Sequence, residues 1–150
     1  MASRVWQASI VVAVLGFVGC ASGDGTKPTI PMPTASSGPE SPVGQDWSLE
    51  SIGGKPVIEG TTLTAAFSGA EQVSGSAGCN RYFGSARVSA GSLSVGPLGS
   101  TMMACGQDGV MEQEFLYLAS LQAATSYTIE GGQLRLGPSE SQVTLVFTSR

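Results

Sequence analysis

Glycine, serine and proline interrupt residues 46–150 so often that only short strands and a single helix fit between them. The uninterrupted runs hold β-branched or alternating apolar residues, which are typical of half-buried strands. One stretch, from about Val110 to Ala124, has helical spacing and contains no glycine or proline. Because strands and helices do not alternate, we expect an α+β fold that is mostly antiparallel β, a compact curved or barrel-like sheet with one packed helix. The expected strands are 47–52, 62–67, 72–77, 85–88, 92–95, 126–130, 133–136 and 142–148.

The expected helix should begin after Asp108, whose side chain can accept a hydrogen bond from the first backbone N–H groups. Apolar residues at helical spacing predict the face that packs on the sheet. These residues are Met111, Phe115, Leu118 and Ala119, with Leu116, Leu121 and Ala123 widening the apolar sector. Its Met and aromatic residues could also form a ligand-binding box, but we favour a core face. Glu112 and Glu114 lie two positions apart and do not share a face, so we expect solvated charges rather than an acid–base pair.

Residues 1–19 have the three-part form of a secretory signal, with a positive charge at Arg4, an apolar stretch and small residues. The uncharged run is 12 residues long, whereas a membrane-crossing helix needs about 18–20. We therefore expect it to be removed rather than kept as an anchor. The end of the segment, Phe17-Val18-Gly19-Cys20, resembles the lipobox of bacterial lipoproteins. That resemblance implies that Cys20 is acylated and becomes the new N-terminus.

Residues 20–45 contain five of the eight prolines, mixed with glycine, serine and threonine. Such a composition cannot bury a core, so we expect an extended tether between the lipidated Cys20 and a folded domain at 46–150. Ala21 rather than Asp follows the cysteine, which by resemblance to such lipoproteins indicates the outer membrane where the host has one. We expect a lipid-anchored protein of the bacterial cell envelope, at its periplasmic or extracellular face.

The chain contains no histidine, which excludes every catalytic or zinc site that depends on an imidazole. Its net charge of −4 and its seven scattered basic residues argue against nucleic-acid binding, which needs clustered Lys and Arg. The sequence also lacks a phosphate-binding glycine loop, a calcium loop and zinc-ligand spacing. We expect no catalytic residues, no metal and no cofactor.

Two cysteine-containing blocks are the most distinctive motifs: Gly-Cys-Asn-Arg at 78–81 and Ser-Thr-Met-Met-Ala-Cys at 100–105. Together with Trp47-Ser48-Leu49, residues 112–116 and the apolar pattern from Tyr127 to Phe147, they resemble the META domain, or HslJ-like family, over essentially all of 46–150. The resemblance implies a compact antiparallel sheet arrangement with one packed helix. It also implies a small envelope protein, frequently a lipoprotein, linked with heat shock, antibiotic tolerance and motility, and no enzymatic reaction.

With Cys20 acylated, two cysteines remain, and an exported protein lies where disulfides persist. We expect Cys79 and Cys105 to form a disulfide. In the chain-entropy model, closing this loop raises the free energy of unfolding by about 3.5 kcal/mol. Two alternatives stay open, a pair of reduced buried thiols and a reactive thiol. The second is disfavoured because the sequence has no C-x-x-C spacing and no histidine to generate a thiolate.

Residues 80–83 allow two interpretations. In the first, Asn80 hydrogen-bonds beside a turn, and Arg81 caps carbonyls or pairs with a carboxylate, so both are structural. In the second, Asn80, Arg81, Tyr82 and Phe83 form a candidate ligand surface, since exposed aromatic side chains beside arginine are common recognition elements.

Three functions are compatible with these features, and we favour the first. It is a non-enzymatic envelope lipoprotein, a monomeric domain that supports stress or antibiotic tolerance by interacting with an envelope component. The second is a periplasmic inhibitor of a hydrolase, a lysozyme or protease, which predicts a protruding loop around Tyr82 and Phe83. The third is an enzyme that uses Tyr, Glu or Asp, and it requires a concave pocket with converging titratable groups.

Overall fold

The computed structural model describes residues 41–150. The expected signal at 1–19, the expected lipid site at Cys20 and residues 21–40 of the expected tether lie outside the described residues. Residues 41–45 were also expected in the tether, but they pack on the barrel: Trp47 Nε1 donates to the backbone oxygen of Pro42, and Val43 forms a bridge with Phe67. The elements are β1 (Asp46–Ile52), β2 (Lys55–Pro56), β3 (Thr64–Ser68), β4 (Gln72–Ser76), β5 (Arg81–Ser89), β6 (Ser92–Ser100), α1 (Val110–Ala123), β7 (Ser126–Glu130), β8 (Gln133–Gly137) and β9 (Leu145–Ser149).

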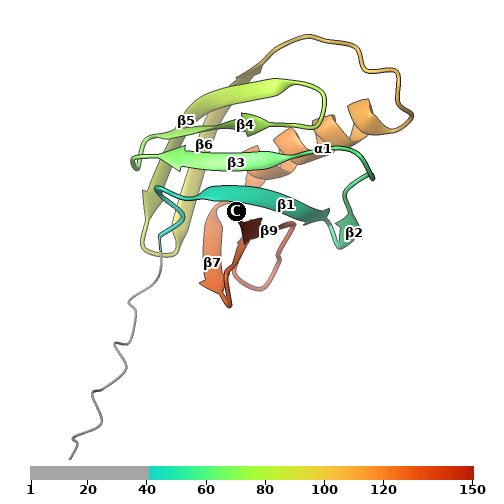
Figure 1. The fold of residues 1–150 in the computed structure, drawn as a ribbon. Coiled ribbons are helices and arrows are strands. Elements are labelled where there is room, and N and C mark those ends of the chain that lie inside the picture. The colour runs from blue at the N-terminus through green and yellow to red at the C-terminus, as the bar shows by residue number, and fades with distance from the viewer. Residues whose placement is uncertain (1–40) are drawn as a thin grey trace, which may run out of the picture. The chain divides into compact units, whose positions relative to one another are not determined.

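The strands form one antiparallel sheet that closes on itself (Figure 1). Strand β1 pairs with β3 on one side and with β9 on the other, so β1 and β3–β9 make an eight-stranded barrel. The short β2 lies beside the end of β1. Strands β6 and β7 meet through a single residue pair, Ser92 and Ser126. The expected fold class, α+β with a barrel-like antiparallel sheet, is confirmed.

Helix α1 packs against strands β6 and β8 and also contacts β1 and β9. Its Tyr117 and Leu121 are fully buried among the aromatic and aliphatic side chains that point into the barrel. The Tyr117 ring lies edge-on to Tyr82, with ring centroids 5.6 Å apart, and to Phe147, with centroids 6.3 Å apart. Together with buried Trp47, these rings form the centre of the core.

The helix buries a different face from the one that its apolar residues predict. Its buried residues are Val110, Gln113, Glu114, Tyr117 and Leu121. Of the residues expected on the packed face, Leu121 is buried and Leu118 is half-buried. The others are exposed: Met111, Phe115, Leu116, Ala119 and Ala123. On two different faces of the helix, residues recur at helical spacing. The contacts of Glu114, described below, hold one of these faces against the barrel.

The start of the helix also differs from the expectation. Gly109, with φ of 78°, is the N-cap, and no side chain caps the helix, so Asp108 does not do so. A left-handed φ is readily adopted by glycine, because it has no Cβ to clash with the backbone. The chain can therefore turn sharply from the preceding loop into α1.

The hairpin of β5 and β6 is longer than the sequence indicated. Strand β5 begins at Arg81 instead of Ser85, and β6 continues to Ser100 instead of ending at Val95. The intervening glycines and proline mark a bend rather than a turn, because the pairing shifts register between Gly84 and Ala86 and then continues. A smaller difference is that β9 starts at Leu145 rather than at residue 142.

Candidate interaction face

A disulfide and a buried asparagine join the two cysteine blocks. Cys79 and Cys105 are bonded, with Cα atoms 6.0 Å apart, so the expected bridge is present. The neighbouring Asn80 is 2% exposed. Its Nδ2 donates to the backbone oxygen of Met103 at 3.1 Å, and its Oδ1 accepts from the backbone N–H of Met103 at 2.7 Å. The side chain thus pairs both backbone groups of Met103 and fixes the loop that follows β6.

Glu114 on α1 holds Asn80 from the opposite side. Its two carboxylate oxygens accept from the backbone N–H and from Nδ2 of Asn80, each at 2.9 Å. Both partners are donors, so a carboxylate, which has only acceptors when ionised, matches them. Glu114 is 6% exposed, and the expectation that it is a solvated charge is wrong. Glu112, two residues earlier, is exposed as expected.

This buried framework supports an exposed apolar surface, which we call the methionine face. It consists of Met102, Met103, Met111, Phe115 and Leu116. Met102 is 97% exposed and Phe115 is 72% exposed. Sequence reasoning missed the face because it assigned Met111 and Phe115 to the core. The two consecutive methionines in the block that ends at Cys105 were the available signal.

Three shallow hollows run along the methionine face. One of about 320 Å³ lies between the loop and the helix and is lined by Met102, Met103 and Met111. A second of about 420 Å³ lies over Met111, Phe115 and Leu116. A third of about 210 Å³ lies between Leu116 and residues 52–58. Because neighbouring hollows share Met111 or Leu116, the loop and the helix present one connected apolar surface.

The methionine face lies far from the point where the described chain begins (Figure 1). Residue 41 is at the end of the barrel that carries the turn between β5 and β6, whereas the loop 101–109 and the start of α1 are at the other end. Tyr82 and Phe83, where an inhibitory loop was expected, lie instead within strand β5.

The four residues of the expected ligand surface do not form one surface. Asn80 and Tyr82 are buried, whereas Arg81 and Phe83 are exposed on the outside of β5. The hydroxyl oxygens of Tyr82 and Tyr117 are 2.8 Å apart, and each lies within hydrogen-bond distance of the backbone oxygen of Thr64. Burial raises the pKa of both tyrosines, so neither is suited to proton transfer near neutral pH.

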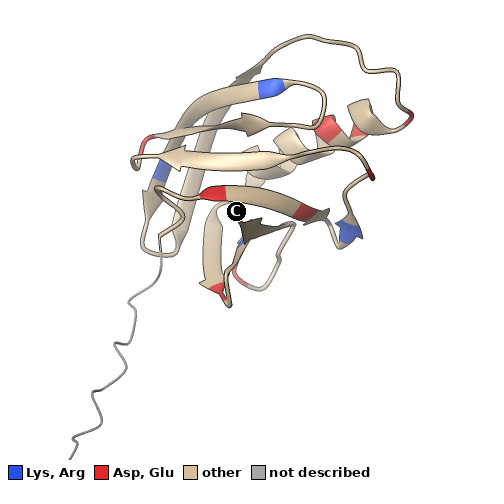
Figure 2. Ribbon diagram, viewed as in Figure 1, with Lys and Arg blue, Asp and Glu red and all other residues tan. Residues whose placement is uncertain are grey.

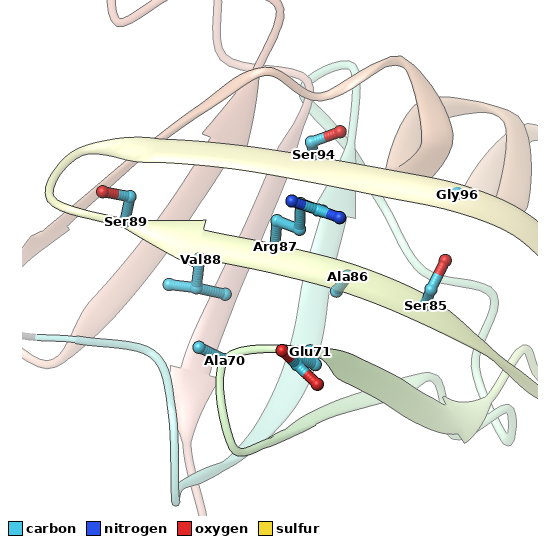
Figure 3. Close-up of a pocket in the computed structure, with 9 residues that line it drawn as sticks. All are labelled: Ala70, Glu71, Ser85, Ala86, Arg87, Val88, Ser89, Ser94 and Gly96. Carbon is cyan, nitrogen blue, oxygen red and sulfur yellow. The ribbon is translucent and has the colours of Figure 1, made fainter.

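A fourth hollow, of about 650 Å³ and more polar than the other three, lies on the outer side of β5 and β6 (Figure 3). Its lining includes Glu71, Arg87 and several serines. Elsewhere on the described chain, charged residues are spread over separate strands and turns (Figure 2). Within residues 41–150, no group of three His, Cys, Asp or Glu side chains could hold a metal ion. In the same range, no helix is long and apolar enough to span a membrane.

Comparison with known proteins gives one family and two solved structures. The family model of the META domain matches residues 41–150. An NMR structure of a protein from Burkholderia xenovorans is 28% identical, with a TM-score of 0.56, over 73% of this chain and 83% of that one. A second NMR structure is also 28% identical, with a TM-score of 0.55, over 69% of this chain and 87% of its own. No curated protein matches the chain.

Proposed function

The chain belongs to the META domain family, and from this premise we propose that it is a non-enzymatic, lipid-anchored envelope protein that binds a protein partner through the methionine face. The observation that carries the proposal is the contrast between the two sides of α1. On the buried side Glu114 bonds to Asn80, while on the other side Met111, Phe115 and Leu116 are exposed, next to Met102 and Met103 of the loop that the disulfide and Asn80 hold.

Connected exposed apolar surfaces lower solubility, and in soluble proteins they mark interaction sites. The exposed methionine face therefore favours a binding role. The loop backbone at Met103 is fixed by Asn80, but the methionine side chains have three rotatable bonds and can adapt to a partner. A fixed backbone also reduces the entropy that binding would otherwise lose. We therefore assign recognition to the side chains of Met102, Met103 and Phe115.

The partner proposed is an apolar segment of another envelope protein. An anchored chain would enter the barrel at residue 41, whereas the loop 101–109 and the start of α1, which carry the methionine face, lie at the other end of the barrel (Figure 1). The exposed carboxylate of Glu112 lines two of the three hollows. A segment with apolar residues flanked by Lys or Arg would complement this combination.

The anchor and the compartment are part of the proposal. The bridge between Cys79 and Cys105 supports an oxidising compartment, since disulfides are rare where thiols are kept reduced. Intact mass of the membrane-extracted protein should show an acylated N-terminus at Cys20, and an unmodified N-terminus elsewhere would overturn the anchor. Limited proteolysis should cut between residues 21 and 40 and leave 41–150 whole, because Pro42, Val43 and Gly44 contact the barrel.

A role in stress or antibiotic tolerance follows from the family resemblance. It predicts that cells lacking the protein lose viability after heat or antibiotic exposure. It further predicts that a chain with Met102, Met103 and Phe115 replaced by serine does not restore viability, although it folds. Restoration by that variant would separate the tolerance role from the methionine face.

The binding proposal is tested by site-specific photocrosslinking in cells. A photoreactive phenylalanine analogue at position 115 should give a discrete crosslinked band, and serine at Met102 and Met103 should weaken it. The matched control is the same analogue at position 83, because Phe83 is also exposed but lies on β5. No band from position 115, or the same band from both positions, would contradict the proposal.

A further inference from the structure

A polar groove follows the outer face of strand β5. The hollow of about 650 Å³ and a neighbouring one of about 510 Å³ share Glu71 and Ser85, so they are continuous. Together they extend from Phe83 to Ser89, which at about 3.3 Å per residue is a length of roughly 20 Å. We call this surface the β5 groove.

Phe83 provides a flat apolar platform at one end of the β5 groove. The side chain is 67% exposed. Its ring tip lies over Gly99, the partner residue on β6, and a Cβ at that glycine would come within 3.1 Å of the ring. Because Gly99 has no side chain, the ring can rest on the backbone of β6. The position of the ring is therefore set by the sheet.

Hydrogen-bond donors and acceptors line the rest of the groove, among the apolar Ala70, Ala86 and Val88. Arg87 and Glu71 lie on either side of β5, with the hydroxyls of Ser85, Ser89 and Ser94 around them (Figure 3). A guanidinium only donates hydrogen bonds, an ionised carboxylate only accepts them, and a hydroxyl does both. Small side chains leave these groups accessible to a bulky ligand.

We propose that the β5 groove binds a neutral glycan strand. A sugar ring has a face of C–H groups that packs on an aromatic ring, and hydroxyls at its edge that need both donors and acceptors. Phe83 supplies the first, and Arg87, Glu71 and the serines supply the second. The elongated shape of the groove suits several linked rings.

Other ligand classes fit the groove less well. A nucleic acid would require more than the single arginine that lines it. An added peptide strand would need a free sheet edge, but β5 is paired with β4 and β6. A lipid chain would need a continuous apolar lining, whereas here Arg87, Glu71 and several serines interrupt the apolar side chains of Ala70, Ala86 and Val88.

The test is binding by the full chain, purified in detergent, to three named probes: insoluble peptidoglycan, chitotetraose and cellotetraose. Phe83→Ala should weaken binding roughly tenfold, the loss of about one stacked ring. Phe83→Tyr keeps the ring and should bind like the unchanged chain. Phe115→Ala is the matched control, because it removes an equally exposed phenylalanine from the methionine face. NMR shifts on ligand addition should centre on the Gly99 and Arg87 amides.

The pattern of probes identifies the source of the glycan. Binding to peptidoglycan and chitotetraose, but not to cellotetraose, would assign a cell-wall glycan, and binding to all three would assign sugar rings in general. Binding to none of them at millimolar concentration would overturn the proposal. The proposal would also be overturned if Phe83→Ala and Phe115→Ala weakened probe binding equally. That result would show that the probes adhere to any exposed aromatic ring. Neither result depends on the partner of the methionine face.

Discussion

Replacing Glu114 by glutamine tests whether the buried carboxylate organises the loop beneath the methionine face. The substitution preserves shape but replaces one acceptor oxygen with an NH₂ group. Because Asn80 presents two donors to Glu114, one of them would then oppose a donor. The change loses one hydrogen bond to a charged group and leaves a buried donor unpaired. We expect the free energy of unfolding to fall by about 2–4 kcal/mol.

The assay is urea unfolding of a chain that starts at residue 21, with the fluorescence of Trp47 as the signal that monitors unfolding. Trp47 is its only tryptophan and is fully buried, so its emission reports global unfolding. The matched control is Glu112→Gln, which removes the same charge from the same helix at an exposed position and should change stability by less than about 0.5 kcal/mol. If both variants unfold at the same urea concentration, Glu114 does not hold Asn80 as argued.

Three further changes test other parts of the structure. Replacing Cys79 and Cys105 by serine should cost about 2–4 kcal/mol without unfolding the domain, and thiol titration of the unreduced protein should find no free thiol in the starting chain. Gly75→Ala should cost about 1–3 kcal/mol in urea unfolding, because its Cβ would overlap a backbone carbonyl of β3. Burial raises the pKa of Tyr82 and Tyr117, so above about pH 10 these tyrosines ionise only in the unfolded chain. The free energy of unfolding should therefore fall as the pH rises above about 10. Phenylalanine at both positions should make that fall smaller.

Each of these three has an outcome that would contradict it. Two titratable thiols in protein prepared from cells would remove the bridge. A Gly75→Ala chain as stable as Gly106→Ala, where an added Cβ meets no atom within 4 Å, would show that the sheet absorbs the methyl group. An unchanged urea midpoint between pH 8 and pH 11 would mean that the tyrosines do not titrate differently in the folded and unfolded chains.

The sequence was sufficient for the turn between β7 and β8, which one short segment decides, and for the disulfide, which the cysteine count decides. Gly131 and Gly132 predicted the hairpin of β7 and β8, and both have the positive φ that its turn requires, 58° and 79°. The pairing of Cys79 with Cys105 followed from cysteine number and compartment, since only two cysteines remained after Cys20. In both cases no distant contact was needed to choose between alternatives.

The sequence was insufficient where a distant contact makes the choice. Apolar residues recur at helical spacing on the stripe with Met111 and Phe115, whereas the stripe with Tyr117 and Leu121 also contains Gln113 and Glu114. Apolar periodicity therefore favoured the first stripe, which is the exposed one. The bond between Glu114 and Asn80, 34 positions apart, places the second stripe in the barrel. The methionine face was missed for the same reason, because a surface is recognised only when the buried side is known.

The pairing of β1 with β9 also sets the order in which the barrel can form during synthesis. Trp47 lies opposite Ser149, and Leu49 lies opposite Phe147, about a hundred positions later in the chain. The ribosome must therefore deliver almost the whole sequence before β1 gains its second neighbour. Until then β1 lacks one flanking strand, and contacts of this sequence separation form slowly. Barrel closure is therefore a late event in synthesis, whichever strands pair before it.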